Sequence, residues 1–400
     1  MSEQSPATLD YARSRQKLDL ASTVHQIRAK TGSSVGFLPE WMKLNVGQGR
    51  ILFNEYLEMR LWDPEFCARS DLKEFVGNWG MRRIWKMANF VPGVQVLATN
   101  KIAASAILEA YGLSVPHQAG LHAVSVVPGH GRTSTPEALE SFLLQDLSYP
   151  AFGKPLSGNQ SLGSVSLNSR DASSGMLVGQ DGKKIAAKAL AHEIHDNYAT
   201  GGYIFQSRLI PHEAVRAVCG ERTATVRVLT IAGSQGPSVF RACWKIPAGA
   251  NGVDNFWRPG NLLASLNLED GTIRRVVCGS GLAMTEVDQH PDTHTRLLGM
   301  KVPLWEEICA AALAGAAAMS DFGLLGWDIA ATSSGAVIVE VNDTPDVVMH
   351  QITDRRGILE SAFQRFMEER RQARNFWNAN IRAAARKEYS PSVWFSPLEK

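Results

Sequence analysis

The sequence predicts an α/β (α+β) protein with two β-sheet regions between a mostly helical N-terminal part and a C-terminal helix. Three observations predict this class. Residues 9–90 alternate charged and apolar residues at helical spacing and contain few strand-like runs. Between 203 and 277, runs of β-branched and apolar residues alternate with turn residues, as in an antiparallel sheet. Residues 326–342 add two strand-like runs around a turn at Ser334.

The helical N-terminal part is followed by a short apolar run, Val94 to Ala98, that we expect to form a strand. Asn100 then caps a helix that starts at Lys101 and stops at Gly112. A domain boundary is therefore expected near residue 95.

A small α/β unit comes next. Short strands are predicted around 121–127, 149–154 and 164–168, with the turn-rich segment 157–164 between the last two. A helix is predicted from Lys183 to Asp196.

Two further helices are predicted near the C-terminus. The alanine-rich segment from Trp305 to Met319 is apolar almost throughout, so we expect it to be buried against a sheet. From Gly357 to Lys387 the pattern is basic and amphipathic, which predicts a helix with one solvated face that can dock onto the N-terminal domain.

Composition limits the class of partner. The 41 Lys and Arg residues nearly balance the 39 Asp and Glu residues, and a net charge of +2 argues against nucleic acid or an anionic membrane as main partner. Five scattered cysteines without a C-x-x-C pair indicate buried thiols in a reducing compartment. The polar N-terminus and the lack of a run of roughly 18 apolar residues predict a cytoplasmic protein without a membrane span.

The hairpin around Ser334 carries the sharpest chemical pattern. Asp328 and Glu340 stand equally far from Ser334 and should be cross-strand neighbours, and Asn342 shares a face with Glu340. Two facing carboxylates repel each other unless a cation lies between them, and oxygen ligands favour Mg²⁺. The alternative is an ordinary exposed hairpin face, against which the apolar residues around these positions argue.

Several cations and a flexible loop add to this pattern. Lys154 ends a strand before the small-residue loop 157–164, whose backbone N–H groups can surround phosphate oxygens; a plain hairpin turn is the alternative. Strand alternation can aim Arg227, Lys245 and Arg258 into a cleft, although each singly is also explained as a solvated charge.

Three histidines attract attention without forming a metal motif. His192 and His195 lack the spacing of H-E-x-x-H and are expected at the surface. His290 lies in a polar loop that either contacts a substrate or caps the loop itself.

Taken in order, seven segments resemble the ATP-grasp superfamily, and more narrowly its sugar-transfer-associated branch, over about residues 95–350. The order of the segments carries the resemblance more than any single one. They are NKIAASAILEAYGLSVP (100–116), FGKPLSGNQSLGS (152–164), YIFQSRL (203–209), TVRVLT (225–230), VDNFWRPG (253–260), HPDTH (290–294) and GWDIA with VIVEVNDTP (326–345).

The resemblance implies an ATP-grasp fold in which two β-sheet lobes enclose ATP. It implies a helical domain at 1–95, a connection at 96–130, a small lid lobe at 131–205, a large lobe with the metal site at 206–352 and a helical tail at 353–400. The implied nucleotide contacts are Lys101, Lys154, the loop residues Ser157, Gly158, Ser161 and Gly163, the adenine hinge Gln206, Ser207, Arg208 and Leu209, and a ribose-binding Glu213. The implied ligands of Mg²⁺, with Mn²⁺ as the alternative metal, are Asp328, Glu340 and Asn342.

This sequence departs from the family pattern at three positions. Gln206 replaces the commoner hinge glutamate, Gly326 stands where many relatives have an arginine, and Asp346 follows Pro345 in place of glycine. The last two lie on the phosphate and acceptor side, so they bear on the substrate more than on the nucleotide.

The activity that the resemblance implies is ADP-forming ligation of a small-molecule carboxylate and an amine through an acylphosphate. Arg227, Arg258 and Lys245 are the expected catalytic cations, with Arg227 or Arg258 standing in for the arginine absent at 326. A phosphotransferase acting on a hydroxyl and a nucleotide-binding scaffold protein are the alternatives. Whether the chain forms a homodimer is left open.

Overall fold

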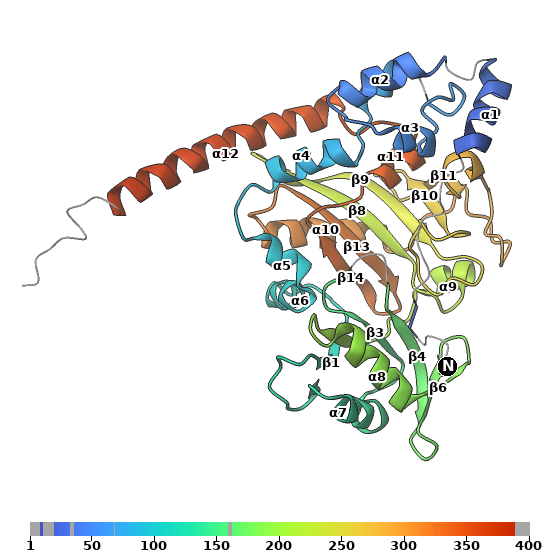
Figure 1. Ribbon diagram of the computed structural model, residues 1–400, viewed down its shortest axis with the longest axis vertical. Coiled ribbons are helices and arrows are strands. Elements are labelled where there is room, and N and C mark those ends of the chain that lie inside the picture. The colour runs from blue at the N-terminus through green and yellow to red at the C-terminus, as the bar shows by residue number, and fades with distance from the viewer. Residues whose placement is uncertain (1–8, 11–19, 33–35, 68, 159–161, 389–400) are drawn as a thin grey trace, which may run out of the picture.

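The computed structural model describes residues 9–10, 20–32, 36–67, 69–158 and 162–388. Within these ranges the chain forms two seven-stranded sheets, the larger above the smaller in Figure 1. The N-terminal helices lie at the far end of the larger sheet, and the long C-terminal helix projects away from the body. No helix in these ranges has both the length and the apolar character that crossing a membrane requires.

The smaller sheet has the strand order β2-β1-β7-β3-β4-β5-β6 and is antiparallel except where β1 pairs with β2. Helices α7 and α8 pack together and bury Leu139, Leu190 and Ile194. The bounds are β1 Gln118–His122, β2 Arg132–Thr133, α7 Pro136–Ser141, a π-helical turn Phe142–Asp146, β3 Ala151–Pro155, β4 Val165–Asp171, β5 Met176–Gly179, β6 Lys184–Ala186, α8 Ala187–Tyr198 and β7 Tyr203–Ser207. β1 thus joins the small sheet although it lies within the connection predicted at 96–130.

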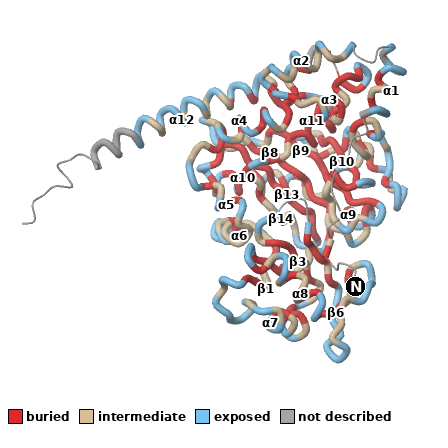
Figure 2. Tube along the Cα trace, viewed as in Figure 1, coloured by how far each residue is buried: buried red, intermediate tan, exposed pale blue. Residues whose placement is uncertain are grey.

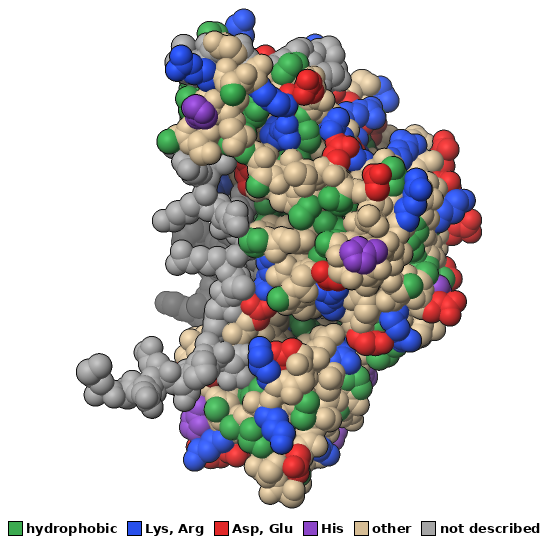
Figure 3. Space-filling model, turned by 90° about the vertical axis from the view of Figure 1, so that its right-hand side faces the viewer, with side chains coloured by type: hydrophobic (Ala, Val, Ile, Leu, Met, Phe, Trp, Pro, Cys, Tyr) green, Lys and Arg blue, Asp and Glu red, His purple; other side chains and the backbone are tan. Residues whose placement is uncertain are grey.

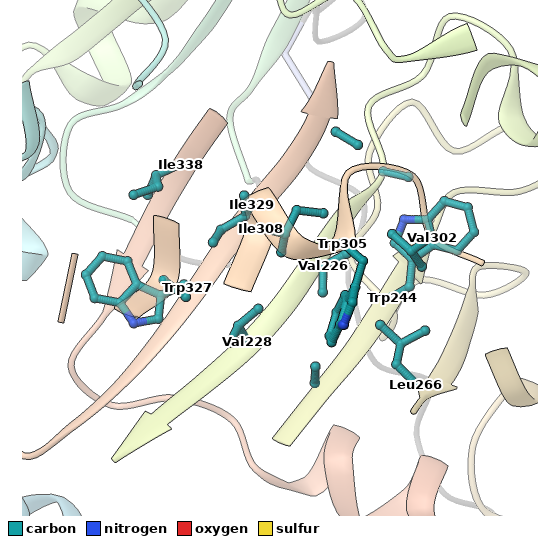
Figure 4. Close-up of a cluster of buried hydrophobic side chains, with 14 of the residues drawn as sticks. Val226, Val228, Trp244, Leu266, Val302, Trp305, Ile308, Trp327, Ile329 and Ile338 are labelled. Atoms are coloured by element: carbon teal, nitrogen blue, oxygen red, sulfur yellow. The ribbon is translucent and has the colours of Figure 1, made fainter. Parts of the chain in front are cut away.

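The larger sheet is antiparallel throughout, in the order β12-β11-β10-β9-β8-β13-β14. Helix α10 packs on one face, where Trp244, Trp305 and Trp327 form the centre of a large apolar core (Figure 4). The bounds are α9 Glu213–Cys219, β8 Thr225–Gly233, β9 Gly236–Ile246, β10 Leu262–Leu266, β11 Ile273–Cys278, a 3-10 turn Gly281–Ala283, β12 Thr285–Glu286, α10 Trp305–Ala318, β13 Leu324–Thr332 and β14 Gly335–Asn342.

The opposite face of the larger sheet is covered by helices from both ends of the chain. Residues of the N-terminal part, Tyr56 and Phe75 among them, share a core with Leu263 of β10 and Met349 of α11, and Figure 2 shows this junction buried. Arg370 of α12 donates from Nε to the carbonyl of Ala88 at the end of α4. The bounds are α1 Leu20–Thr31, α2 Leu38–Val46, α3 Phe53–Glu58, a 3-10 turn Arg69–Glu74, α4 Asn78–Ala88, α11 Val348–Asp354 and α12 Ser361–Glu388.

Most predicted elements are present with shifted ends. The side chain of Asn100 accepts from the N–H groups of Ile102 and Ala103, which confirms it as the cap of α6 (Lys101–Ala110). The helix expected from Lys183 begins only at Ala187, because residues 184–186 pair with β5 as an edge strand. The docking of the C-terminal helix onto the N-terminal part is confirmed by the contact between α12 and α4.

The strand predicted at Val94 to Ala98 is wrong, because the chain forms helix α5 (Gln95–Thr99) there. This helix packs against α6 and β14 and buries Ala98. A five-residue apolar run fits a buried strand and a helical turn equally well, so its periodicity could not decide between them.

Candidate active site

A cavity of about 310 Å³ lies at the junction of the two sheets. In Figure 3 the molecule narrows between the smaller lobe below and the rest above, and both acidic and basic side chains lie on this face near the narrowing. The smaller sheet contributes Phe152, Lys154 and Gln206 to its wall, and the larger sheet contributes Arg227 and Lys245. Helix α6 adds Lys101, and the β13–β14 hairpin adds Asp328, Glu340 and Asn342. The junction therefore brings together side chains from most of the segments singled out in the sequence.

The hairpin has the predicted pairing. Asp328 on β13 pairs directly with Glu340 on β14, and Asn342 lies opposite Gly326. A bulge follows Asp328, so the pairing toward the turn shifts by one residue. Since Glu340 and Asn342 are two positions apart, all three functional groups reach the same cavity.

Two protein cations hold the carboxylate of Asp328. Arg227 donates from Nε to Oδ1 at 2.6 Å and from Nη2 to Oδ2 at 2.9 Å, and Lys245 Nζ lies 3.1 Å from Oδ1. Burial opposes the charged form of Asp328, but Arg227 and Lys245 outweigh it and hold the pKa of this carboxyl well below its usual range. Asp328 is therefore an ionised carboxylate fixed in a buried ion network.

The repulsion between Asp328 and Glu340 is relieved by the protein itself. Oε1 of Glu340 lies 3.4 Å from Nζ of Lys101, while Asp328 is paired with Arg227 and Lys245. Side-chain cations thus supply the positive charge that the sequence argument requires beside these two carboxylates. The carboxylate and amide oxygens of Asp328, Glu340 and Asn342 are also of the kind that binds Mg²⁺.

Lys154 is a buried lysine whose surroundings lower its pKa. It is 9% exposed at the end of β3, and burial, with Lys101 nearby, lowers its pKa to about 8 against the opposing pull of Glu340 and Asp328. A buried ammonium group loses hydration that a bound anion can replace. The cavity wall around Lys101 and Lys154 is suited to phosphate oxygens.

Because Gly326 has no side chain, the side chain of Arg227 can pack directly beside it. A Cβ atom at position 326 would lie 2.7 Å from Cβ of Pro345 and 3.4 Å from Cδ of Arg227. A side chain at 326 is therefore excluded by backbone-anchored Pro345, and the guanidinium of Arg227 reaches the cavity beside this glycine from the neighbouring strand β8.

The predicted phosphate loop contributes unequally. Gly158 lines the cavity, whereas Ser157 is exposed outside it. Gly163, with φ of 74°, lies behind the wall, where a Cβ would come within 2.1 Å of the Tyr198 hydroxyl. Ser161 lies outside the described residues.

The predicted hinge lines the cavity along its whole length, from Gln206 to Leu209. Two of its main-chain donors are already used within the protein: the N–H of Ser207 donates to His117 O, and the N–H of Arg208 donates to Pro150 O. These two groups therefore do not offer hydrogen bonds to a base.

Some expected residues lie away from the cavity. Glu213 is exposed at the start of α9, and Arg258 is buried behind the wall, where it pairs with Asp10. His290 is buried, bonds Pro247 O through Nε2 and caps its own loop at Asp292 N, which favours the capping alternative. His195 is half-buried and bonded to His122, so the expectation of a surface residue is wrong for it.

Sequence reasoning missed Asp254, and it noted Asp346 only as a departure from the family pattern. Asp254 accepts from the N–H of Thr225 at 2.8 Å and lies 3.5 Å from Nζ of Lys245; burial raises its pKa. Asp346 accepts from the indole of Trp257 at 2.8 Å. Both line the cavity from loops, where no periodicity marks a functional position.

Two sheets enclosing a cavity lined by lysines and hairpin carboxylates define an ATP-grasp architecture. The chain belongs to the sugar-transfer associated ATP-grasp family, whose model matches residues 92–366, and thus to a superfamily of ATP-dependent enzymes. Among curated proteins, none matches the sequence.

Several solved structures are similar in fold. The D-alanine–D-alanine ligase from Coxiella burnetii is 11% identical with a TM-score of 0.44, covering 74% of this chain and 63% of that chain. Biotin carboxylase from Campylobacter jejuni is 11% identical with a TM-score of 0.41, covering 70% and 47%. An L-amino acid ligase from Bacillus licheniformis is 12% identical with a TM-score of 0.37, covering 70% and 52%. The chain spans less than two-thirds of the length of each.

Proposed function

We propose that the protein is an ADP-forming carboxylate–amine ligase that builds an amide or peptide bond on a small metabolite or a saccharide-linked precursor. The observation that carries the proposal is the cavity itself. On one side it presents Lys101 and Lys154, and on the other a fixed Arg227–Asp328–Lys245 network. Positive charge from both lobes thus converges where a phosphoryl group would be transferred.

In this proposal ATP lies across the junction of the lobes. The hinge from Gln206 to Leu209 forms the wall for the base, while Lys101, Lys154 and Gly158 surround the phosphates. Lys101 already reaches the loop, because its Nζ lies 3.2 Å from the carbonyl of Gly158. The cavity lining does not include Gly163 or Glu213, and Ser161 lies outside the described residues.

The hairpin donors fit a divalent cation. Asp328 accepts two hydrogen bonds from Arg227 and forms an ion pair with Lys245, and Glu340 and Asn342 supply further oxygens to the same cavity. Nδ2 of Asn342 is buried without a hydrogen-bond partner among the described residues. No hydrogen bond of this nitrogen therefore holds the amide in an orientation that would keep its oxygen from a metal ion. Bound Mg²⁺ would neutralise charge on the transferring phosphate oxygens.

Arg227 and Lys245 supply the remaining charge. An oxygen of the substrate carboxylate would attack the γ-phosphorus, the bond to the ADP oxygen would break, and an acylphosphate would result. The amine nitrogen would then attack the acyl carbon, inorganic phosphate would leave and the amine would lose a proton. Arg227 and Lys245 are held in place by Asp328, so they are preorganised to stabilise negative charge in both steps.

The test is ADP release from the full chain against panels of carboxylic acids and amines, with mass analysis of the products. We expect one acid to stimulate turnover only together with an amine and to yield an amide. A Lys245→Met variant should reduce kcat more than ATP affinity. If no acid–amine pair stimulates ADP release, the proposal fails.

A phosphotransferase acting on a hydroxyl is the second candidate, and Asp254 favours it. This buried carboxyl faces the cavity beside Lys245, and its raised pKa suits it to accept a proton from an attacking hydroxyl. A phosphate ester on a hydroxyl, formed when neither a carboxylic acid nor an amine is present, would support this candidate over the ligase.

A further inference from the structure

Leu9 and Asp10, the two described residues that precede α1, contact the lobes on either side of the cavity. Leu9 is 4% exposed and belongs to the core of the smaller lobe. Its N–H donates to Oε1 of Glu193 on α8 at 3.2 Å. The segment is thus anchored to the smaller lobe by both an apolar contact and a hydrogen bond.

The main chain of Asp10 forms two hydrogen bonds with the end of the phosphate loop. Its N–H donates to the carbonyl of Ser164 at 3.1 Å, and its own carbonyl accepts from the N–H of Gly163 at 2.7 Å. These two bonds form a β-bridge immediately before β4. Any movement of Asp10 is therefore shared with Gly163 and Ser164.

The side chain of Asp10 reaches the other lobe. Its carboxylate pairs with Nη1 of Arg258, which follows the cavity residue Trp257 in the loop before β10. One residue thus ties the phosphate loop of the smaller lobe to a buried guanidinium of the larger one.

Arg258 is incompletely satisfied by this contact. It is 3% exposed, yet its Nε and Nη2 atoms are buried without a hydrogen-bond partner among the described residues. In Arg227 the same two atoms bind both oxygens of Asp328. Arg258 therefore keeps unpaired the edge that binds a carboxylate or phosphate group with two parallel bonds.

We propose that Arg258 binds an anionic group of the acceptor-side substrate, and that Asp10 occupies Arg258 until that group displaces it. A partner using Nε and Nη2 makes two charge-assisted bonds where Asp10 makes one. Displacement also breaks the ion pair between the Asp10 side chain and the larger lobe. The two backbone hydrogen bonds from Asp10 to Gly163 and Ser164 remain. Anion binding is thereby coupled to the phosphate loop.

This proposal rests on the proposed function in one respect: it takes the anion that binds Arg258 to be a carboxylate of the substrate. Succinate and inorganic phosphate serve as probes, because the first carries carboxylates and the second does not. The Nε–Hε resonance of Arg258 in ¹⁵N-labelled full-length protein, assigned by its loss in Arg258→Lys, reports binding without turnover. ATP affinity is measured in parallel, so that failure of nucleotide binding counts against the proposed function and not against this site.

We expect Asp10→Asn to lower the Kd of the better probe at Arg258 by about tenfold, since a neutral amide competes less well than a carboxylate. The same probe should speed hydrogen exchange at the Gly163 N–H in the wild type. Unchanged affinity in Asp10→Asn, with the Arg258 resonance intact, would show that Asp10 is a structural strap and overturn the proposal. If Arg258→Lys binds the probe in calorimetric titration as tightly as the wild type does, the anion binds elsewhere, and this result would also overturn the proposal.

Discussion

If Lys154 contacts the phosphates as proposed, we expect ATP binding to depend on pH. The Lys154 pKa of about 8 lies below that of an ordinary lysine, so it loses its proton as pH rises through about 8. Bound phosphates favour the charged form and raise this pKa, so ATP binding takes up a proton above pH 8. The Kd for ATP should then rise with pH, by up to about tenfold per unit.

Calorimetric titration with ATP between pH 6.5 and 9.5 measures this dependence. Lys154→Arg is the matched control, because a guanidinium stays protonated across the range. Equal slopes for the two proteins would mean that Lys154 does not contact the phosphates.

Arg227 is expected to matter for stability as well as activity. Replacing it by methionine leaves Asp328 buried with Lys245 as its remaining cation, which should cost about 3 kcal/mol or more. Because the folded pKa of Asp328 is lowered, its contribution is present above the ordinary carboxyl pKa and is lost as pH falls. Urea unfolding at pH 7 and pH 2.5, the second below the ordinary carboxyl pKa, should therefore show a smaller difference between the two pH values in Arg227→Met than in the wild type.

At the scale of single elements, the β13–β14 hairpin tolerates no side chain at Gly326. Gly326→Ala places a methyl group 2.7 Å from Cβ of Pro345, so we expect a loss of about 1–3 kcal/mol together with weaker activity from a displaced Arg227. Gly129→Ala is the control, because nothing lies within 4 Å of its added Cβ. Equal unfolding midpoints for the two variants would contradict this close packing.

How far the sequence predicts an element depends on how local its determinants are. The pairing of Asp328 with Glu340 follows from a turn at Ser334, and the cap at Asn100 follows from neighbouring residues. Helix α5 could not be assigned because its apolar run is short and its partners lie elsewhere in the chain.

The candidate site shows the same limit. Lys101, Lys154 and the hairpin were predictable because they lie within patterned segments. The contact of Asp10 with Arg258 joins residues 248 positions apart, and Asp254 lies in a loop. Only the folded chain brings such residues together.

At the scale of the whole molecule, the N-terminal helices and the larger lobe share one core. Gln351 on α11 donates from Nε2 to Val76 O and accepts from Val76 N–H, both at 2.8 Å. The same helix places Met349 in the cavity wall. The N-terminal part therefore supports the helix that places Met349 in the cavity wall.

This continuity predicts that the family-matching region does not fold by itself. A chain beginning at residue 92 would expose Phe256, Leu263 and Met349, which the N-terminal residues bury. We expect it to be insoluble or to unfold without a cooperative transition, because lost apolar burial of roughly 25 cal/mol per Å² accumulates over this interface. A chain ending at residue 380, which keeps the α12 contact through Arg370, should unfold close to the full chain in a thermal scan. Cooperative unfolding of the 92–400 chain at the full-length Tm would show that the shared core is dispensable.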